Sequence, residues 1–303
     1  MTSRPGAIPG HPGRARAWLL AARPPTLTAA VAPVIVGTAV AARADAFAGG
    51  PALAALIGAI ALQVGANFAN DVSDFRRGAD HAGRVGPPRA AAMGMLSEAA
   101  IVRGMVAAFA LAALMGVYLA SVVGWPIIAV GLASIAAAVT YTGGPWPYGY
   151  RALGEVFVFL FFGVVAVAGT YYAQAGELSR AALAASVPVG FTVTAILVVN
   201  NVRDIDSDRL AHKRTLAVYL GRRLARVQYL ATVAGAYLAV AALWLVGDFS
   251  AGVMLAWLSL PVTLGPARAV LTRTDGPALN AALRATARLH FVFSGLLALG
   301  VLW

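Results

Sequence analysis

Apolar stretches of about 18 to 25 residues follow one another along most of this chain. Each is long enough to cross roughly 30 Å of hydrocarbon as an α-helix, the form in which a single segment satisfies its own backbone hydrogen bonds in lipid. Hydrophobic residues make up 60% of the 303-residue sequence and charged residues 12%, which excludes an ordinary soluble domain. The sequence therefore predicts an all-α integral membrane protein.

Hydropathy predicts about nine transmembrane helices, packed in one bundle with a central cavity. The predicted spans lie near residues 25–42, 51–70, 99–122, 125–142, 152–174, 182–201, 227–246, 250–267 and 285–303. The N-terminus is rich in proline and glycine, so we expect a flexible tail over residues 1–16. Residues 17–303 are expected to form a single transmembrane domain.

Basic residues fall mainly on one side of the predicted bundle. If the N-terminus is cytoplasmic, all 23 basic residues except Arg43 and Arg180 lie in inner segments. The positive-inside rule therefore favours an N-in, C-out orientation. The basic inner loops account for the net charge of +11, and no basic stripe interleaved with stacking aromatics points to nucleic acid. Abundant arginine and alanine with a single lysine are typical of a GC-rich genome and favour a bacterial plasma membrane.

A run of polar residues closes the second predicted span. Asn67, Asn70, Asp71 and Asp74 have i, i+3, i+4, i+7 spacing, which places them on one face of a helix. From the rise per residue, the stripe is on the order of 10 Å long. Asp80 follows in the loop. Oxygen-bearing side chains are thus expected to gather at the inner end of this helix.

A similar run closes the sixth predicted span. Asn200 or Asn201, Asp204 and Asp208 lie one turn apart on one helical face, whereas Asp206 points elsewhere. The pattern recurs four spans apart, which weakly indicates an internal duplication, since the other residues do not visibly repeat.

Carboxylates crowded at a membrane boundary repel one another, so a cation is expected to neutralise them. Carboxylate and amide oxygens suit a hard cation, and Mg²⁺ usually takes one or two carboxylates and completes its shell with water and phosphate oxygens. The chain has no cysteine, which excludes thiolate ligands. Two such clusters predict a site for a metal-bridged diphosphate. The alternative is a pair of solvated helix ends capped by Asp and Asn, which is common for any single Asp.

These residues resemble the N-D-x-x-D and D-x-x-x-D motifs of the UbiA-type membrane prenyltransferases. Within that superfamily the chain is most similar, from about residue 17 to its end, to the MenA-type branch that prenylates 1,4-dihydroxy-2-naphthoate in menaquinone synthesis. The supporting stretches are AARPPTLTAAVAPVIVGTA from Ala21, ANFANDVSDFRRGAD from Ala66, YTGGPWPYGYRALGE from Tyr141, GTYYAQ from Gly169 and NNVRDIDSDRLAHKRTLAVYLG from Asn200. Gly78 replaces a third aspartate of some superfamily members, and His212 replaces an expected small residue.

The resemblance implies transfer of a polyprenyl group from an allylic polyprenyl diphosphate to 1,4-dihydroxy-2-naphthoate, with loss of diphosphate and carbon dioxide. It implies Mg²⁺ as cofactor and a site on the cytoplasmic side. The expected catalytic residues are Asp71, Asp74, Asp204, Asp208 and Tyr141, whose ring would face the allylic cation. The expected metal ligands are Asn67, Asn70, Asp71, Asp74, Asp80, Asn200, Asn201, Asp204 and Asp208. The expected diphosphate-binding residues are Arg76, Arg203, Lys213 and Arg214.

Four residues of the loop after the fourth span and of the fifth span's start are expected to bind the acceptor: Tyr148, Tyr150, Arg151 and Glu155. Each has a second interpretation. The tyrosines suit an interfacial aromatic belt and Arg151 a topological role, while Glu155 can pair with Arg151 or act on a hydroxyl proton.

Two other functions stay open. Another superfamily acceptor, namely 4-hydroxybenzoate, homogentisate, haem or a sugar phosphate, would suit the same motifs. A secondary transporter also carries polar residues in its spans. The clusters here lie at one edge and not at the midplane, and the span interiors lack a relay of ionisable groups, which disfavours transport.

Overall fold

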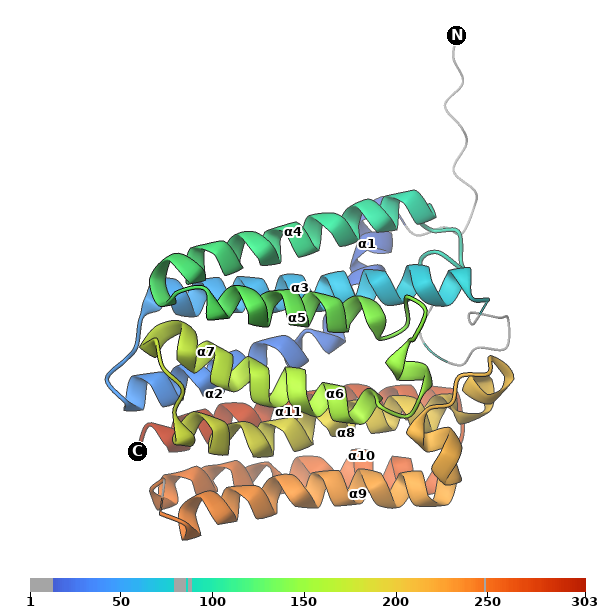
Figure 1. Ribbon diagram of the computed structural model, residues 1–303. Helices are drawn as coiled ribbons and strands as arrows, with labels where there is room; N and C mark the ends of the chain where they lie inside the picture. Colours follow the sequence, from blue (N-terminus) through green and yellow to red (C-terminus); the bar gives the residue numbers. More distant parts are fainter. Residues whose placement is uncertain (1–12, 79–85, 87–88, 248) are drawn as a thin grey trace.

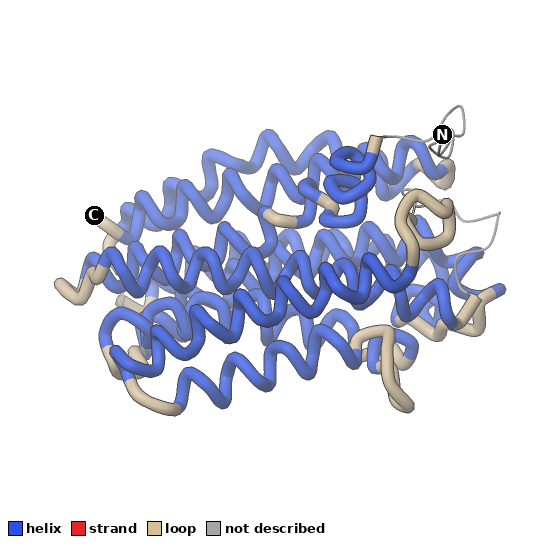
Figure 2. Tube along the Cα trace, turned by 90° about the horizontal axis from the view of Figure 1, so that it is seen from above, coloured by secondary structure: helices blue, strands red, loops and turns tan. Residues whose placement is uncertain are grey.

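The structure is a computed structural model that describes residues 13–78, 86, 89–247 and 249–303. In these residues helices are the only extended regular elements, and they run side by side in one bundle (Figures 1 and 2). The first part comprises α1 (Arg14–Ala22), the 3₁₀ helix η1 (Pro24–Thr26), α2 (Thr28–Arg43), α3 (Gly49–Arg76), α4 (Glu98–Val123) and α5 (Pro126–Thr140). The prediction of an all-α membrane protein is confirmed.

The second part of the chain continues the bundle. It comprises the 3₁₀ turn η2 (Tyr148–Tyr150), α6 (Gly154–Val158), the π-helix η3 (Phe159–Val165), α7 (Ala166–Ala175), α8 (Arg180–Leu210), α9 (Leu216–Leu245), the 3₁₀ helix η4 (Ala251–Ser259), α10 (Leu260–Thr272) and α11 (Gly276–Val301). Side chains cap the N-termini of several of these helices and satisfy backbone donors there, as Ser179 does for α8 and Asp275 for α11.

One helix, or a run of consecutive helices, corresponds to each predicted span. Among the described residues, seven helical segments are long and apolar enough to cross a bilayer. The stretches Arg14–Thr26 and Thr28–Arg43 add an eighth if they count as one span bent by 49°. α5 is apolar but has only 15 residues. Nine crossings and an N-in orientation stay predictions.

α4 forms one edge of the bundle and α9 with α10 the other, and α8 lies between these edges, next to α9 and α10 (Figure 1). α8 packs against α2, η3, α9 and α11, and most of its apolar stretch is buried. Gly163 of η3 lies against Gly190 of α8, and an added Cβ at Gly163 would be 2.5 Å from the Gly190 Cα. Small residues therefore let η3 approach α8 closely.

Two predictions concern residues that the structure does not describe. Of the expected flexible tail, residues 1–12 lie outside the described residues, and α1 already begins at Arg14. The expected metal ligand Asp80 also lies outside the described residues.

Candidate active site

A cavity of about 270 Å³ lies within the bundle, between α2, α3, α5, the α6–η3 segment, α8 and α11. One end is polar, because the C-terminal ends of α3 and α8 both line it. Farther along the helices most of the wall is apolar. The polar lining residues are Arg23, Thr26, Gln63, Asn67, Asn70, Asp74, Arg89, Ser134, Thr142, Asn200, Asp204, Ser207, Asp208 and Lys213.

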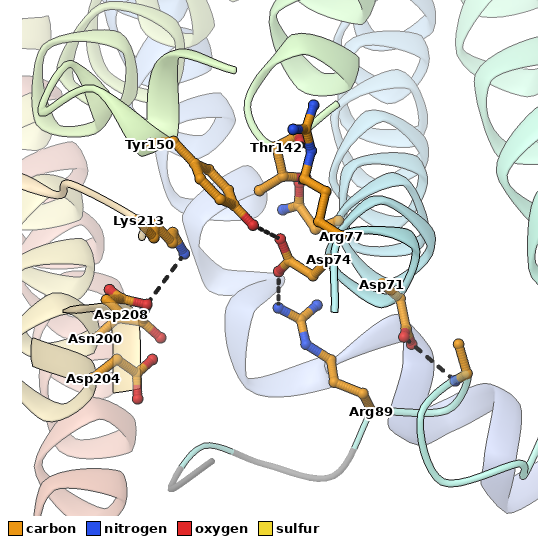
Figure 3. A network of polar contacts seen from close by, with 12 residues as sticks. Asp71, Asp74, Arg77, Arg89, Thr142, Tyr150, Asn200, Asp204, Asp208 and Lys213 are labelled. Atoms are coloured by element: carbon orange, nitrogen blue, oxygen red, sulfur yellow. Dashed lines mark hydrogen bonds and ion pairs between the residues drawn. The ribbon is translucent and has the colours of Figure 1, made fainter. Parts of the chain in front are cut away.

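Asp74 on α3 faces this cavity and is almost fully buried. Its carboxylate accepts a hydrogen bond from Arg89 Nη2 at 2.6 Å and another from the Tyr150 hydroxyl at 3.0 Å (Figure 3). Asn70, one turn earlier, lines the same end and accepts from the Thr142 hydroxyl at 2.9 Å. The chain thus supplies a cation for the buried charge of Asp74, as low-dielectric surroundings require.

Asp71 is buried but does not line the cavity. Its carboxylate accepts the backbone N–H groups of Ala90 at 3.0 Å and Ala91 at 3.4 Å (Figure 3). Asp71 therefore fixes the turn that carries Arg89. The two aspartates of one motif have different partners here, although sequence analysis placed both in the metal site.

Asn67 lies farther from the expected metal. It is seven residues before Asp74 on the same helix, which separates their Cα atoms by about 10 Å along the axis. Its amide nitrogen donates to the Ala22 carbonyl at 2.9 Å and to the Thr26 hydroxyl at 3.1 Å. Asn67 thus joins a polar cluster deeper in the cavity wall.

The second motif faces the first from α8 (Figure 3). Arg203 donates to both carboxylate oxygens of Asp204, at 2.8 and 2.5 Å, and to Asn200 Oδ1 at 2.8 Å. Asp208 has Lys213 Nζ 3.7 Å from its Oδ1. Its other oxygen, Oδ2, is buried without a hydrogen-bond partner among the described residues. This oxygen is a ready ligand position for a cation.

Lys213 sits between the two motifs. Its ammonium group lies 5.4 Å from the centre of the Tyr150 ring. Burial by itself lowers the pKa of Lys213, but the attraction of the Asp208 and Asp74 carboxylates outweighs it and holds the pKa above its ordinary value. Burial, followed by the charge of Asp74, raises the pKa of Tyr150. Lys213 is therefore a cation and Tyr150 a neutral hydrogen-bond donor at physiological pH.

Several expected site residues lie elsewhere. Arg76 is exposed and pairs with Glu98 at 2.6 Å. Arg151 is exposed, and its guanidinium lies over the Trp146 ring at 5.0 Å. Arg214 does not line the cavity, and its backbone N–H donates to the Tyr150 carbonyl. The structure therefore does not bring these three arginines to the polar end.

Glu155 and Asn201 form a buried pair that is also absent from the cavity lining. Asn201 Nδ2 donates to Glu155 Oε1 at 3.0 Å. The bond joins α6 to α8. Within the described residues, Glu155 makes no ion pair with Arg151.

An aromatic wall borders the polar end of the cavity. Tyr141 lines it and meets the Tyr148 ring edge to face, with centroids 5.3 Å apart. Tyr148 stacks on Phe157 at 4.0 Å and donates its hydroxyl to the Ala137 carbonyl. Phe161 and Phe162 of η3 continue the wall. Such ring faces can stabilise a cation in the cavity.

Two lining arginines escaped the sequence analysis. Arg89 was attributed to an inner loop, and nothing in the sequence links it to Asp74. Arg23 precedes Pro24 and Pro25, which cannot continue α1, and it ends that helix with φ at 52°. The R-P-P signal could have marked a chain bend that turns Arg23 into the bundle.

The donor set fits a divalent cation shared with a ligand. In the part of the chain that the structure describes, no three Asp, Glu or His side chains converge to hold a metal alone. Each motif instead offers carboxylate and amide oxygens at opposite sides of the polar end. Mg²⁺ commonly uses one or two carboxylates together with substrate phosphates. The unpartnered Asp208 Oδ2 is consistent with that arrangement.

Comparisons with known proteins agree with this architecture. The 1,4-dihydroxy-2-naphthoate octaprenyltransferase of Mycobacterium tuberculosis is 46% identical over 72% of this chain and 75% of its own length. The Escherichia coli protein of the same name is 37% identical over 95% of this chain and 96% of its own.

The same fold occurs in a UbiA homolog from Archaeoglobus fulgidus bound to GPP and Mg²⁺, with a TM-score of 0.64 at 15% identity. That likeness covers 93% of this chain and 99% of the homolog. The model of the UbiA prenyltransferase family matches residues 30–295. With its cavity and its two motifs, this chain belongs to the UbiA prenyltransferase family.

Proposed function

We propose that the chain transfers a polyprenyl group from an allylic polyprenyl diphosphate to 1,4-dihydroxy-2-naphthoate, giving demethylmenaquinol, diphosphate and carbon dioxide. The observation that carries the proposal is one cavity that joins two facing acidic motifs to an apolar and aromatic wall. Such a space suits a charged head and a hydrocarbon tail together. The names of the two relatives support the naphthoate acceptor.

Mg²⁺, when bound, would neutralise the diphosphate and stabilise its charge as it leaves. Asp74, Asp204 and Asp208, with Asn70 and Asn200, would hold it, since their oxygens line the polar end. The A. fulgidus homolog, solved with GPP and Mg²⁺, supports a divalent cofactor and a prenyl diphosphate substrate.

The cations of the site are placed to receive the diphosphate oxygens. Arg89 and Lys213 line the polar end, where each now neutralises a motif carboxylate. With a metal held by the motif carboxylates, both groups would be available for charge-assisted hydrogen bonds to the diphosphate. Donors fixed in a dry site stabilise a departing anion strongly.

The aromatic wall serves the other product of bond cleavage. When the allylic C–O bond breaks, its electron pair leaves with the diphosphate and an allylic cation remains. Tyr141, Tyr148 and Phe157 offer ring faces to that cation. The apolar wall excludes water, which would otherwise capture the cation. A ring carbon of the acceptor then bonds to the allylic carbon. The bond from the ring to the ionised carboxylate breaks, its electron pair restores the aromatic ring, and carbon dioxide leaves.

We also propose nine spans, an N-in and C-out orientation, a bacterial cell membrane and one domain over residues 17–303. The polar end of the cavity then faces the cytoplasm. Exposed basic residues at the same end, among them Arg209 and Arg223, support this orientation.

The test is a metal-dependent assay. Purified protein in detergent is incubated with a polyprenyl diphosphate, 1,4-dihydroxy-2-naphthoate and Mg²⁺, and the products are analysed by mass spectrometry. We expect a product that has gained the prenyl group and lost carbon dioxide, and none with EDTA. Product formation from 4-hydroxybenzoate in place of the naphthoate would overturn the acceptor assignment.

A further inference from the structure

A cluster of three polar side chains lies in the cavity wall, farther from the polar end than the acidic motifs. Thr26 comes from η1, and Gln63 and Asn67 come from α3. All three line the cavity. Gln63 is 11 residues before Asp74, so their Cα atoms are about 16 Å apart along the helix. The cluster is thus a small polar group in a part of the wall that is otherwise mainly apolar.

Hydrogen bonds within the cluster fix the orientation of each group. Thr26 donates its hydroxyl to the Arg23 carbonyl at 2.9 Å, so its oxygen can only accept from the other two. It accepts from Gln63 Nε2 at 3.1 Å and from Asn67 Nδ2 at 3.1 Å. Gln63 Nε2 also lies 3.5 Å from Asn67 Oδ1. A flipped Gln63 amide would set oxygen against oxygen, so the nitrogen must face the cluster.

One acceptor is left over. Gln63 is 8% exposed, and its Oε1 is buried without a hydrogen-bond partner among the described residues. A buried amide oxygen without a donor carries a desolvation penalty. Every other hydrogen-bonding atom of the three side chains has a partner. The cluster therefore holds one carbonyl oxygen in place, ready for a donor from outside the chain.

The chemistry of the ligands identifies that donor, and this step rests on the proposed function. An ionised diphosphate has only acceptor oxygens near the metal, and a prenyl tail has no polar hydrogen. The acceptor carries two phenolic hydroxyls, which donate. We propose that Gln63 Oε1 accepts a hydrogen bond from a hydroxyl of the dihydroxynaphthoate, and so orients the ring and selects a hydroxylated acceptor.

The position of Gln63 agrees with this role. The ring must lie between Gln63 and the allylic carbon, whose diphosphate is held at Asp74, and the separation along α3 leaves room for a ring system and a diphosphate in series. Accepting a hydrogen bond from a phenol also raises the electron density of its ring. Gln63 is thus a specificity-determining residue, and the proton stays on the hydroxyl.

The experiment compares the wild type with Gln63→Leu, which keeps a similar volume and removes the acceptor. The probes are 1,4-dihydroxy-2-naphthoate and its two mono-O-methyl ethers, which keep each oxygen but remove one donor. In the wild type, we expect one ether to bind about 10- to 100-fold more weakly as a competitive inhibitor than the parent binds. In Gln63→Leu that difference should vanish, with a raised KM for the acceptor and an unchanged KM for the prenyl diphosphate.

Gln174→Leu is the matched control. Gln174 also hydrogen-bonds through its amide, to the Thr38 hydroxyl, but it lies outside the cavity lining. Gln174→Leu should bind the dihydroxynaphthoate more tightly than the methyl ether, by the same factor as the wild type. Equal binding of the parent and both ethers to the wild type would overturn the proposal. A difference in binding between parent and ether that persists in Gln63→Leu would overturn it as well. Absence of decarboxylated product with the wild type would instead overturn the proposed function.

Discussion

Two aspartates on one helix show how narrowly the site selects its residues. Asp208 faces the cavity with a buried, unpartnered oxygen, whereas Asp206, two positions earlier, has a 77% exposed side chain that pairs with Arg222 at 2.8 Å. We expect Asp208→Asn to abolish metal-dependent turnover, since it removes a charged ligand and little volume. Asp206→Asn is the control and should keep near-normal activity. Near-normal turnover of both variants in the metal-dependent assay would contradict a metal ligand at Asp208.

Arg89 and Asp74 form a buried ion pair, with side chains 8% and 5% exposed. Removing one partner of such a pair costs about 3–5 kcal/mol, because the other charge stays buried alone. Arg89→Met should therefore lower the thermal unfolding midpoint in metal-free detergent solution. Because a divalent cation can neutralise Asp74, Mg²⁺ should raise the midpoint more in Arg89→Met than in the wild type. A smaller Mg²⁺ effect in the variant would count against a metal at Asp74.

At the scale of single helices, the contact between η3 and α8 depends on glycine. A Cβ at Gly163 would lie 2.5 Å from the Gly190 Cα, while one at Gly169 in α7 would meet nothing within 4 Å. Gly163→Ala should destabilise the protein by about 1–3 kcal/mol, as overpacking does. It should also reduce turnover, since η3 carries Phe161 and Phe162. Gly169→Ala should be close to neutral by the same unfolding and activity measurements.

The helices show what the sequence could predict and why the rest escaped it. Hydropathy predicts the apolar part of α3 at residues 51–70, but the helix runs to Arg76. Its last residues are polar, and a hydropathy window does not detect a polar helical turn. The π-helical hydrogen bonding of η3 leaves no signal in composition. Motif spacing did place Asp74, Asp204 and Asp208 together. The partner of Asp74 comes from a loop, and loop conformation does not follow from periodicity.

The differing partners of Asp71 and Asp74 were likewise beyond periodicity. Residues three apart share a helical face, which the sequence established. Which of them reaches the cavity depends on the turn at Ala90 and Ala91, whose backbone donors occupy Asp71. Helical spacing thus predicts neighbours on a face and not the partner each neighbour takes.

For the molecule as a whole, orientation can be tested with single reporters because the chain has no cysteine. Glu177, between α7 and α8, and Arg209, at the far end of α8, are both exposed. With an N-in orientation, Glu177→Cys should react with a membrane-impermeant thiol reagent in intact cells. Arg209→Cys should react only after permeabilisation. The opposite labelling pattern would reverse the orientation.

Three motif carboxylates have cationic neighbours within the chain: Asp74 has Arg89, Asp204 has Arg203 and Asp208 has Lys213. The pairs act as internal counter-ions that keep charge balanced in a poorly polarisable interior. A bare cation meets three competing cations, and a bare diphosphate meets carboxylates that repel it. The electrostatic repulsion is smaller when the cation and the diphosphate bind together as a complex of low net charge. If the proposed function holds, substrate capture would replace salt bridges within the protein by salt bridges to the metal and the diphosphate.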